Sequence, residues 1–409
     1  MSVIEKYQPR CRIFLLNGEK FRTNLFALFF DLPLQRETTT KTALLAEVLK
    51  RNHWQEMAVQ AEELYGALWD VSVVKKGDRQ LLLFSLETLK TVPAEEALNF
   101  LKKCIQRPME EGRFEEKTVK RQKAILRRKL EGLRDNKRAF AQKRVSEETA
   151  EGTPYAVSGD GYLEDLEEIG EKSLFLYYRN MLEKAEVKIF FCGDKIEKSK
   201  VLSLRQEFPG KVSVTEQMGQ EQPKNGPRFL QEHAKMKQAR LLLGFSADTE
   251  YSHRQVALLL LNHLLGGSPD SLLFQKIREE QGLCYDVKSY LEPMSPYLFV
   301  QVGIDAGDAR ETGKQVLKAI EQLKKEVSEE KLKQAKDNIL HNYDGMADSS
   351  WAMVDFFAEQ ALQGNPMTTE KFLRQLERVD AEDIMRAAEH LGLRVVYLLS
   401  EKEEEHGSE

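Results

Sequence analysis

Two kinds of apolar pattern follow one another near the start of the chain. An uninterrupted apolar run at residues 24–32 predicts a buried strand. After the polar connection at residues 35–40, apolar side chains return at the spacing of one helical face. This face comprises Ala43, Leu44, Leu45, Val48 and Leu49. The pattern therefore predicts a strand, a threonine-rich connection that can cap a helix, and then the helix.

The same order of elements returns a little over 200 residues later. Residues 240–245 predict a strand, residues 246–253 a polar connection, and residues 254–265 a helix. Gly266 and Gly267 then supply a signal for the end of that helix. Because each half also closes on a run rich in β-formers, the repetition predicts an internal duplication. Each half is expected to be an α+β sandwich.

The region between the two halves has the composition of a linker. Residues 207–228 are rich in Gln, Gly, Pro and Lys and carry little periodic apolar signal. A chain of 409 residues is also too long for one ordinary core and fits two domains of about 200 residues each. We therefore predict an N-terminal domain at residues 1–206, a linker at 207–228 and a C-terminal domain at 229–409.

Composition narrows the class of protein. With 41% hydrophobic and 31% charged residues and a mean hydropathy of -0.50, the chain is typical of a globular protein and not of a membrane-spanning one. It shows neither a secretory leader nor an apolar stretch of 18 residues, which predicts a cytoplasmic location without membrane contact. The four cysteines lie far apart without a CxxC pair, which predicts reduced thiols.

One stretch is strongly basic, although the net charge of the whole chain is -5. Between Lys117 and Arg144 there are twelve Lys or Arg residues against two acids, Glu131 and Asp135. Nucleic-acid binding is not expected, because Phe140 is the only aromatic residue in the stretch. The favoured interpretation is the solvated face of a long amphipathic helix. An acidic partner and the inner wall of a peptide-binding chamber remain open.

Several segments together resemble a known family over nearly the whole chain. Residues 260–290 contain a helix ending in Gly-Gly, then Phe274, Arg278 and the Gly-Leu-x-Tyr sequence that starts at Gly282. This stretch is similar to the most recognisable C-terminal segment of the insulinase/pitrilysin-like metallopeptidases. Residues 152–169 resemble the Pro-Tyr loop of the same family, and residues 190–201 its Gly-Asp strand end. The resemblance implies two halves arranged as a metallopeptidase clamshell, a fold of the LuxS/MPP-like type.

The zinc motif of that family is not conserved in this chain. Catalytic members carry HxxEH, because two histidines at i and i+4 share one helical face and the glutamate can polarise a zinc-bound water. At the matching position Leu44 and Val48 replace both histidines, and only Glu47 keeps its type. The third ligand, a glutamate on a helix about 80 residues later, falls at Arg127 or Arg128, as the resemblance implies. No metal or other cofactor is therefore predicted for this chain.

A second constellation of the family survives. Gly282 is expected to end a helix and reverse the chain into a strand that begins at Leu283, so that Arg278 and Tyr285 face one cleft. In the resembling family these two residues bind a peptide held at the zinc site, where arginine grips carbonyl or carboxylate groups and tyrosine stabilises an oxyanion. The alternative is that Arg278 pairs with a neighbouring glutamate on the surface and Tyr285 is a half-buried strand residue.

The resemblance also implies partners. In two-gene versions of the family one subunit keeps HxxEH and the other supplies the Arg/Tyr pair. We therefore expect a pseudoenzyme without peptidase activity alone, an HxxEH-bearing paralogous partner that holds the zinc, and a peptide or unfolded polypeptide substrate. A homodimer of the chain alone, and a non-catalytic scaffold or interaction protein, are the alternatives. The segment around Glu47 most resembles bacterial YfmF-type proteins, which implies a connection with the modification of elongation factor P.

Overall fold

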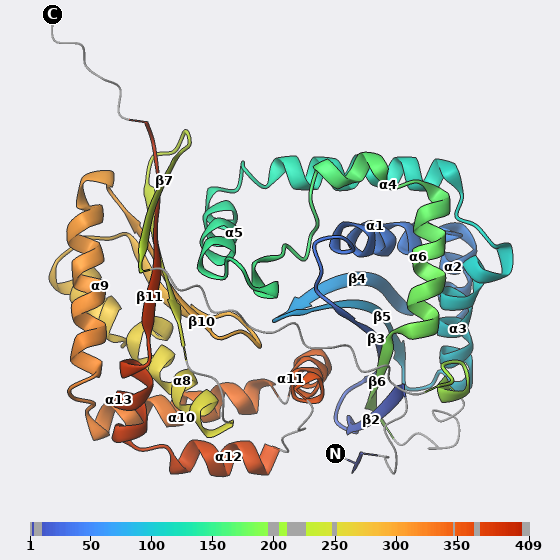
Figure 1. Cartoon of the computed structure of the whole chain (residues 1–409). Coiled ribbons are helices and arrows are strands. Elements are labelled where there is room, and N and C mark those ends of the chain that lie inside the picture. Colours follow the sequence, from blue (N-terminus) through green and yellow to red (C-terminus); the bar gives the residue numbers. More distant parts are fainter. Residues whose placement is uncertain are drawn as a thin grey trace, which may run out of the picture. The chain divides into compact units, whose positions relative to one another are not determined.

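The computed structural model describes residues 2–3, 10–194, 204–210, 226–247, 252–346, 348–363 and 369–402. The chain forms two compact units, and neither is continuous in sequence (Figure 1). Unit 1 comprises Met1–Glu131, Val157–Gly219 and Asp344–Pro366. Unit 2 comprises Gly132–Ala156, Gln220–Tyr343 and Met367–Glu409.

Unit 1 is built on a six-stranded sheet in the order β1-β2-β6-β3-β5-β4. Strands β2 and β6 are parallel, and the other neighbours are antiparallel. The predicted strand at residues 24–32 is β3 at the centre of the sheet, where Leu25 to Asp31 pair with β5 on one side and with β6 on the other. The strands are β1 (Ser2–Val3), β2 (Cys11–Asn17), β3 (Thr23–Pro33), β4 (Leu68–Lys76), β5 (Arg79–Leu89) and β6 (Glu186–Gly193).

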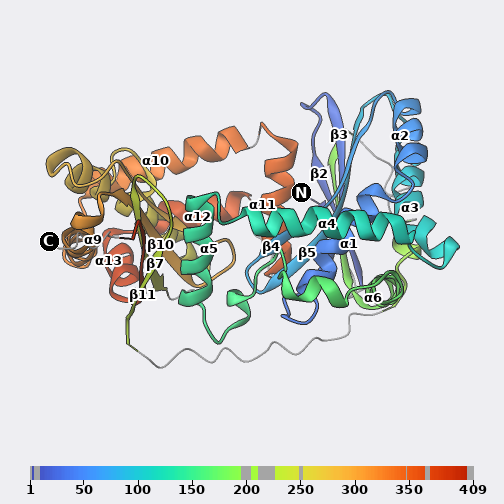
Figure 2. The ribbon, with the colours of Figure 1, turned by 90° about the horizontal axis from the view of Figure 1, so that it is seen from above.

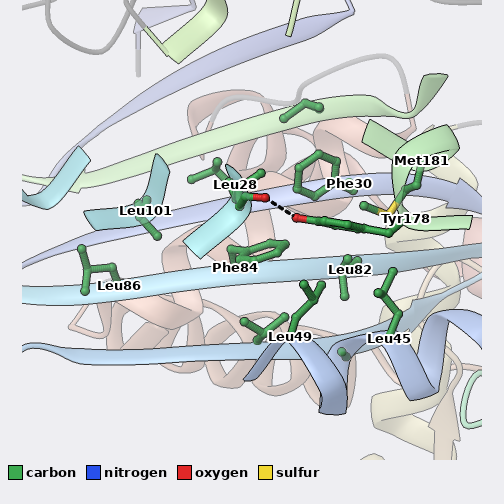
Figure 3. Close-up of a cluster of buried hydrophobic side chains, with 14 of the residues drawn as sticks. Leu28, Phe30, Leu45, Leu49, Leu82, Phe84, Leu86, Leu101, Tyr178 and Met181 are labelled. Atoms are coloured by element: carbon green, nitrogen blue, oxygen red, sulfur yellow. Dashed lines mark hydrogen bonds between the residues drawn. The ribbon is translucent and has the colours of Figure 1, made fainter. Parts of the chain in front are cut away.

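Helices cover both faces of this sheet. On one face Phe30, Leu82 and Phe84 of the strands share a core with Leu45 and other residues of the surrounding helices (Figure 3). In that core the buried Tyr178 hydroxyl donates a hydrogen bond of 2.6 Å to the Ile105 carbonyl. The helices of unit 1 are α1 (Thr39–Arg51), α2 (Trp54–Glu63), α3 (Ala94–Glu111), α4 (Glu116–Gly132), η2 (Glu164–Glu168), α6 (Glu171–Lys184) and α11 (Ser350–Leu362).

The opposite face of the sheet in unit 1 is covered by α11, which comes from the second half of the chain. Val354, Phe357 and Ala361 of this helix join a core with Phe14 and Phe190 of the strands. The ammonium group of Lys76 binds Asp355 at 2.9 Å and Glu359 at 2.6 Å, which fixes the same helix to the sheet. Apolar burial and ion pairing therefore act together here.

A buried ion-pair network crosses the same sheet. Lys188 on β6 is 1% exposed, and its Nζ lies 2.6 Å from Asp31 Oδ2 on β3. Arg79 Nε on β5 lies 2.6 Å from the other oxygen of Asp31. Because the charges are removed from water, each depends on the others for compensation.

Unit 2 repeats this topology with five strands in the order β7-β11-β8-β10-β9. The first pair is again parallel and the others antiparallel, as in β2-β6-β3-β5-β4 of unit 1. The predicted α+β fold with two similar halves is confirmed, while the duplication itself stays a prediction. The strands are β7 (Arg228–His233), β8 (Ala239–Ser246), β9 (Asp286–Leu291), β10 (Tyr297–Ile304) and β11 (Gly392–Ser400).

The sheet of unit 2 is also covered by a helix from the other half of the chain. Ala141 and Val145 of α5 share a core with Phe299 and Tyr397 of the strands. At Gly244 on β8 the helix comes so close that a Cβ atom would overlap Thr149 Oγ1. The helices of unit 2 are α5 (Lys137–Thr149), η1 (Pro154–Ala156), α8 (Ser252–Asn262), η3 (His263–Gly267), η4 (Phe274–Glu280), η5 (Ala306–Asp308), α9 (Ala309–Leu323), α10 (Glu329–Met346, except its end), α12 (Thr369–Arg378) and α13 (Ala381–Glu389).

The compact units differ from a linear division of the chain. The predicted domains at 1–206 and 229–409 assign each helix to the half in which it occurs, whereas α5 and α11 each cover the sheet of the other half. Apolar periodicity shows that a helix needs a sheet to cover but not which of two similar sheets it covers. Residues 211–225 of the predicted linker lie outside the described residues. Within the described ranges, no helix is long and apolar enough to span a bilayer.

Candidate functional site

The two histidine positions of the zinc motif lie inside a hydrophobic core. Leu44 and Val48 on α1 are both 0% exposed and belong to the core that covers the sheet of unit 1. Glu47 is partly exposed on the same helix. Leucine and valine have no lone pair with which to bind a metal, and at these positions both side chains pack in the core. The residues present at these two positions therefore do not fit a zinc ion.

The third ligand position carries positive charge. Arg127 on α4 forms an ion pair with Glu167, and Arg128 beside it is exposed. Figures 1 and 2 both show α4 running next to α1. A guanidinium group repels a divalent cation and supplies no lone pair. Within the parts of the chain that the structure describes, no three His, Cys, Asp or Glu side chains are grouped so that they could hold a metal ion.

The basic stretch forms two helices instead of one long helix. Helix α4 ends at Gly132, and Asn136 caps the start of α5 by accepting a hydrogen bond of 3.1 Å from the Ala139 amide. Many of the charges bind local acids, as Lys129 does with Asp160 at 2.8 Å and Arg144 with Glu232 at 2.7 Å. These pairs support the solvated-face interpretation, with the correction that the face is divided between two compact units.

Gly282 ends the helical turn η4, as the sequence predicts. It adopts a φ of 61°, and the Leu283 amide donates to the Ile277 carbonyl at 3.0 Å. The strand β9 begins at Asp286, three residues later than expected. Arg278 on η4 is 44% exposed, its guanidinium lies 4.8 Å above the Phe274 ring, and its Nε lies 3.8 Å from Glu279. This ion pair is the one that the alternative interpretation of Arg278 expects.

Tyr285 lies at the surface and not within a strand. Its side chain is 51% exposed, and its backbone amide donates to the Gly303 carbonyl at 2.8 Å. The hydroxyl donates to both carboxylate oxygens of Asp305, at 3.1 and 3.2 Å. This hydrogen bond and the charge of Asp305 raise the pKa of Tyr285. The tyrosine is therefore a neutral donor that already has an acceptor within its own chain.

Sequence reasoning did not identify Asp305 as part of this site. It follows the end of β10 directly, while Tyr285 precedes the start of the neighbouring strand β9. Antiparallel pairing of these two strands brings the two ends together. The sequence signal that could have indicated Asp305 is a tyrosine directly before one strand and a carboxylate directly after the next strand, because antiparallel pairing of the two strands brings these positions together.

Comparisons with known proteins agree with this picture. Residues 169–339 match the family model described as the peptidase M16 inactive domain. The chain is 27% identical over 403 residues to the probable inactive metalloprotease YmfF of Bacillus subtilis, covering 94% of each protein. It is 24% identical over 283 residues to the uncharacterized zinc protease YmxG of the same organism, covering 68% of this chain and 69% of YmxG. The subgroup resemblance is thereby confirmed, under the name YmfF and not YfmF.

Solved structures show the same fold over nearly the whole chain. A conserved protein from Enterococcus faecalis superimposes with a TM-score of 0.86 at 25% identity, covering 97% of both chains. A peptidase M16 inactive domain from Pseudomonas fluorescens gives a TM-score of 0.80 at 19% identity, covering 98% of both chains.

Proposed function

We propose, from the premise that this chain belongs to the insulinase-like peptidase M16 family as one of its inactive members, that it is the zinc-less subunit of a two-subunit peptidase. The observation that carries the proposal is a contrast between two sets of family positions. The zinc-motif positions Leu44 and Val48 are buried and aliphatic, whereas the substrate-binding positions Arg278 and Tyr285 keep their residue types and are accessible to solvent. A subunit that binds the peptide but not the zinc would need the second set of residues and not the first.

The proposed division of labour gives this chain the binding of the peptide. The zinc ion belongs to an HxxEH-bearing paralogue, which supplies the metal-assisted hydrolysis. Arg278 would bind a carbonyl or carboxylate of the peptide, for which its guanidinium would leave the 3.8 Å contact with Glu279. The Tyr285 hydroxyl would transfer its hydrogen bond from Asp305 to the oxyanion that develops on the substrate. The chain alone would be inactive.

The test combines the chain with an HxxEH-bearing paralogue from the same organism. Neither protein alone should cleave a fluorogenic peptide at the rate of the mixture. In the mixture, Tyr285→Phe should lower kcat about 100-fold, as the loss of one oxyanion donor does in other hydrolases. Arg278→Ala should mainly raise KM. Arg310→Ala and Tyr65→Phe, which change exposed residues of the same types elsewhere, should leave both constants unchanged.

A non-catalytic scaffold is the second candidate function, and one observation favours it. Arg278 contacts Glu279 and Tyr285 donates to Asp305, so both side chains have partners within the chain when no substrate is bound. A scaffold would bind the paralogue in a pull-down assay, but the rate of cleavage would be the same with Arg278→Ala, with Tyr285→Phe and with the unchanged chain. Assembly with peptide substrates, a homodimer, the cytoplasmic location and the connection with elongation factor P stay predictions.

A further inference from the structure

Strand β9 lies at the edge of the described sheet in unit 2, with β10 as its neighbour on one side. Asp286, Lys288 and Tyr290 alternate along β9, so they share one face of the strand. Tyr290 packs against the core that α5 forms with the sheet, which identifies this face as the one beneath α5. Lys288 therefore lies on the α5 side of the sheet, at its edge, three residues after Tyr285.

The neighbouring strand supplies no carboxylate to Lys288. The residue opposite Lys288 on β10 is Gln301, which is 0% exposed and accepts a hydrogen bond of 2.8 Å from Gln142 of α5. The diagonal positions on β10 are Phe299 and Gly303. Cross-strand neighbours are where a charged strand residue ordinarily meets an opposite charge. At Lys288 these positions are all uncharged.

The carboxylate two residues before Lys288 is bound elsewhere. Arg240 on β8 reaches across Gly303, and its Nη1 lies 2.6 Å from Asp286 Oδ1. A Cβ atom at Gly303 would overlap the same oxygen, so the glycine makes room for this ion pair. Asp286 Oδ2 makes no hydrogen bond to a described residue, Lys288 included. The ion pair with Arg240 thus leaves Lys288 without a carboxylate in direct contact.

A second cation lies near Lys288. Arg138 precedes Gln142 by one turn of α5 and shares the side of the helix from which Gln142 reaches Gln301. Burial lowers the pKa of Lys288, and the charge of Arg138 lowers it further, whereas Asp286 raises it. Among the residues that the structure describes, neither Lys288 nor Arg138 has an ion-pair partner. Two neighbouring cations in this state are stabilised by an anion.

The balance of charge on this face is positive. Arg138, Lys288 and Arg240 are opposed by Asp286. The next carboxylate along the chain, Glu292, follows the end of β9, accepts from Ser146 at 2.9 Å and is not among the charges that shift the pKa of Lys288.

The environment of Lys288 also differs from that of a lysine whose role is to protect a sheet edge. A lysine that only keeps another chain from pairing with an edge strand extends into water. Lys288 is partly buried, and its Nζ lies 5.0 Å from the centre of the Tyr290 ring. The amine is therefore held over the sheet, where a ligand at the open edge can reach it.

We propose that Lys288 and Arg138 bind an acidic side chain of the peptide that Arg278 and Tyr285 hold, and so make the subunit selective for acidic peptides. This selectivity rests on the proposed function, because the ligand is the same peptide. Three residues of a strand span about 10 Å, so a short peptide at Tyr285 reaches Lys288. An ammonium and a guanidinium group together offer charged N–H donors to both oxygens of a carboxylate. Inorganic phosphate shares this oxyanion chemistry and is the alternative ligand.

Isothermal titration of the full chain, without a partner subunit, measures the selectivity. The probes are alanine hexapeptides, acetylated and amidated at their ends, with a single glutamate, glutamine or lysine in the middle, and inorganic phosphate. The glutamate peptide should bind about tenfold more tightly than the glutamine peptide, because only the charge differs. The lysine peptide should bind most weakly. Equal binding of the glutamate and glutamine peptides, or no binding of either, would overturn the assignment.

Variants locate the binding. Lys288→Gln and Arg138→Gln should each remove most of the tenfold preference, and Lys288→Glu should reverse it in favour of the lysine peptide. Arg138 is exposed on α5, so its variant remains a test if a change at Lys288 disturbs the fold. Lys314→Gln, which changes an exposed lysine of α9 that lies 3.7 Å from Glu311, is the matched control and should have no effect. A preference for glutamate that persists in Lys288→Glu would contradict the site. Phosphate binding as tight as that of the glutamate peptide would assign it to a free anion.

A second measurement separates this inference from the proposed two-subunit function. In the mixture with the HxxEH-bearing paralogue, kcat/KM should be about tenfold higher for the glutamate peptide than for the glutamine peptide. Cleavage that requires Tyr285 but proceeds equally with both peptides would overturn the selectivity alone. Selective binding by the chain, with no cleavage in the mixture, would instead overturn the two-subunit function and leave the acidic-peptide site in place.

Discussion

The Tyr285 hydroxyl donates its hydrogen bond to Asp305 at 3.1 Å, across the ends of two neighbouring strands. The residue proposed to meet a substrate is therefore oriented by a carboxylate of its own chain before any substrate arrives. This orientation fixes a long aromatic side chain that is otherwise exposed. It also means that a substrate has to compete with Asp305 for the proton of the hydroxyl.

The first prediction concerns the ionisation of Tyr285. Asp305→Asn should lower the pKa of Tyr285, because a carboxylate stabilises the neutral phenol and repels the phenolate. The measurement is an ultraviolet titration, in which the difference between a chain and its Tyr285→Phe variant isolates this tyrosine. Asp308→Asn, which removes a more distant charge, should lower the pKa less. An identical titration with and without Asp305 would contradict the role given to this carboxylate.

The second prediction concerns the buried ion pair of unit 1. Asp31→Ala should lower the free energy of unfolding by about 3–5 kcal/mol, because the buried Lys188 and the partly buried Arg79 would lose their shared carboxylate. Asp348→Ala, which breaks the exposed pair with Lys20, should cost at most about 1 kcal/mol. Urea unfolding followed by circular dichroism compares the two. Equal effects of the two variants would show that burial does not set the strength of the pair.

The third prediction concerns the contact of α5 with the sheet of unit 2. Gly244→Ala should destabilise the protein by about 1–3 kcal/mol, because the new methyl group overlaps Thr149. Adding Thr149→Ala should restore part of this loss, since the overlapping hydroxyl and methyl groups are then absent. Gly307→Ala, where a Cβ meets nothing within 4 Å, is the matched control. Thermal unfolding provides the measurement, and a double variant no more stable than Gly244→Ala would contradict the contact.

The fourth prediction concerns the reactivity of the cysteines. Burial raises the pKa of Cys11 and Cys104 to about 12, and that of Cys192 and Cys284 to about 11. The thiolate is the reactive form, so the folded chain should react slowly with iodoacetamide at pH 7.5 and the urea-unfolded chain should react quickly at all four positions. Intact-protein mass spectrometry counts the additions. Rapid modification of Cys11 in the folded chain would show that its site is open.

Some of this structure could be predicted from sequence, and the reasons are local. The apolar run of β3, the apolar face of α1 and the reversal at Gly282 each depend on residues that are close together in sequence. The break between α4 and α5 was missed because two short helices with basic faces have the same charge pattern as one long helix. The contact of Tyr285 with Asp305 depends on the pairing of two strands, which only the tertiary structure defines.

The covering of each sheet by a helix from the other half has a consequence for synthesis on the ribosome. The sheet of unit 1 has all its strands once residue 193 has been made, but its second apolar face, with Phe14 and Phe190, is closed only by residues 350–362. A nascent chain must therefore carry an exposed apolar surface while most of unit 2 is translated. A fragment that ends after the first half would keep that surface permanently, so separately expressed halves are expected to aggregate when the intact chain does not.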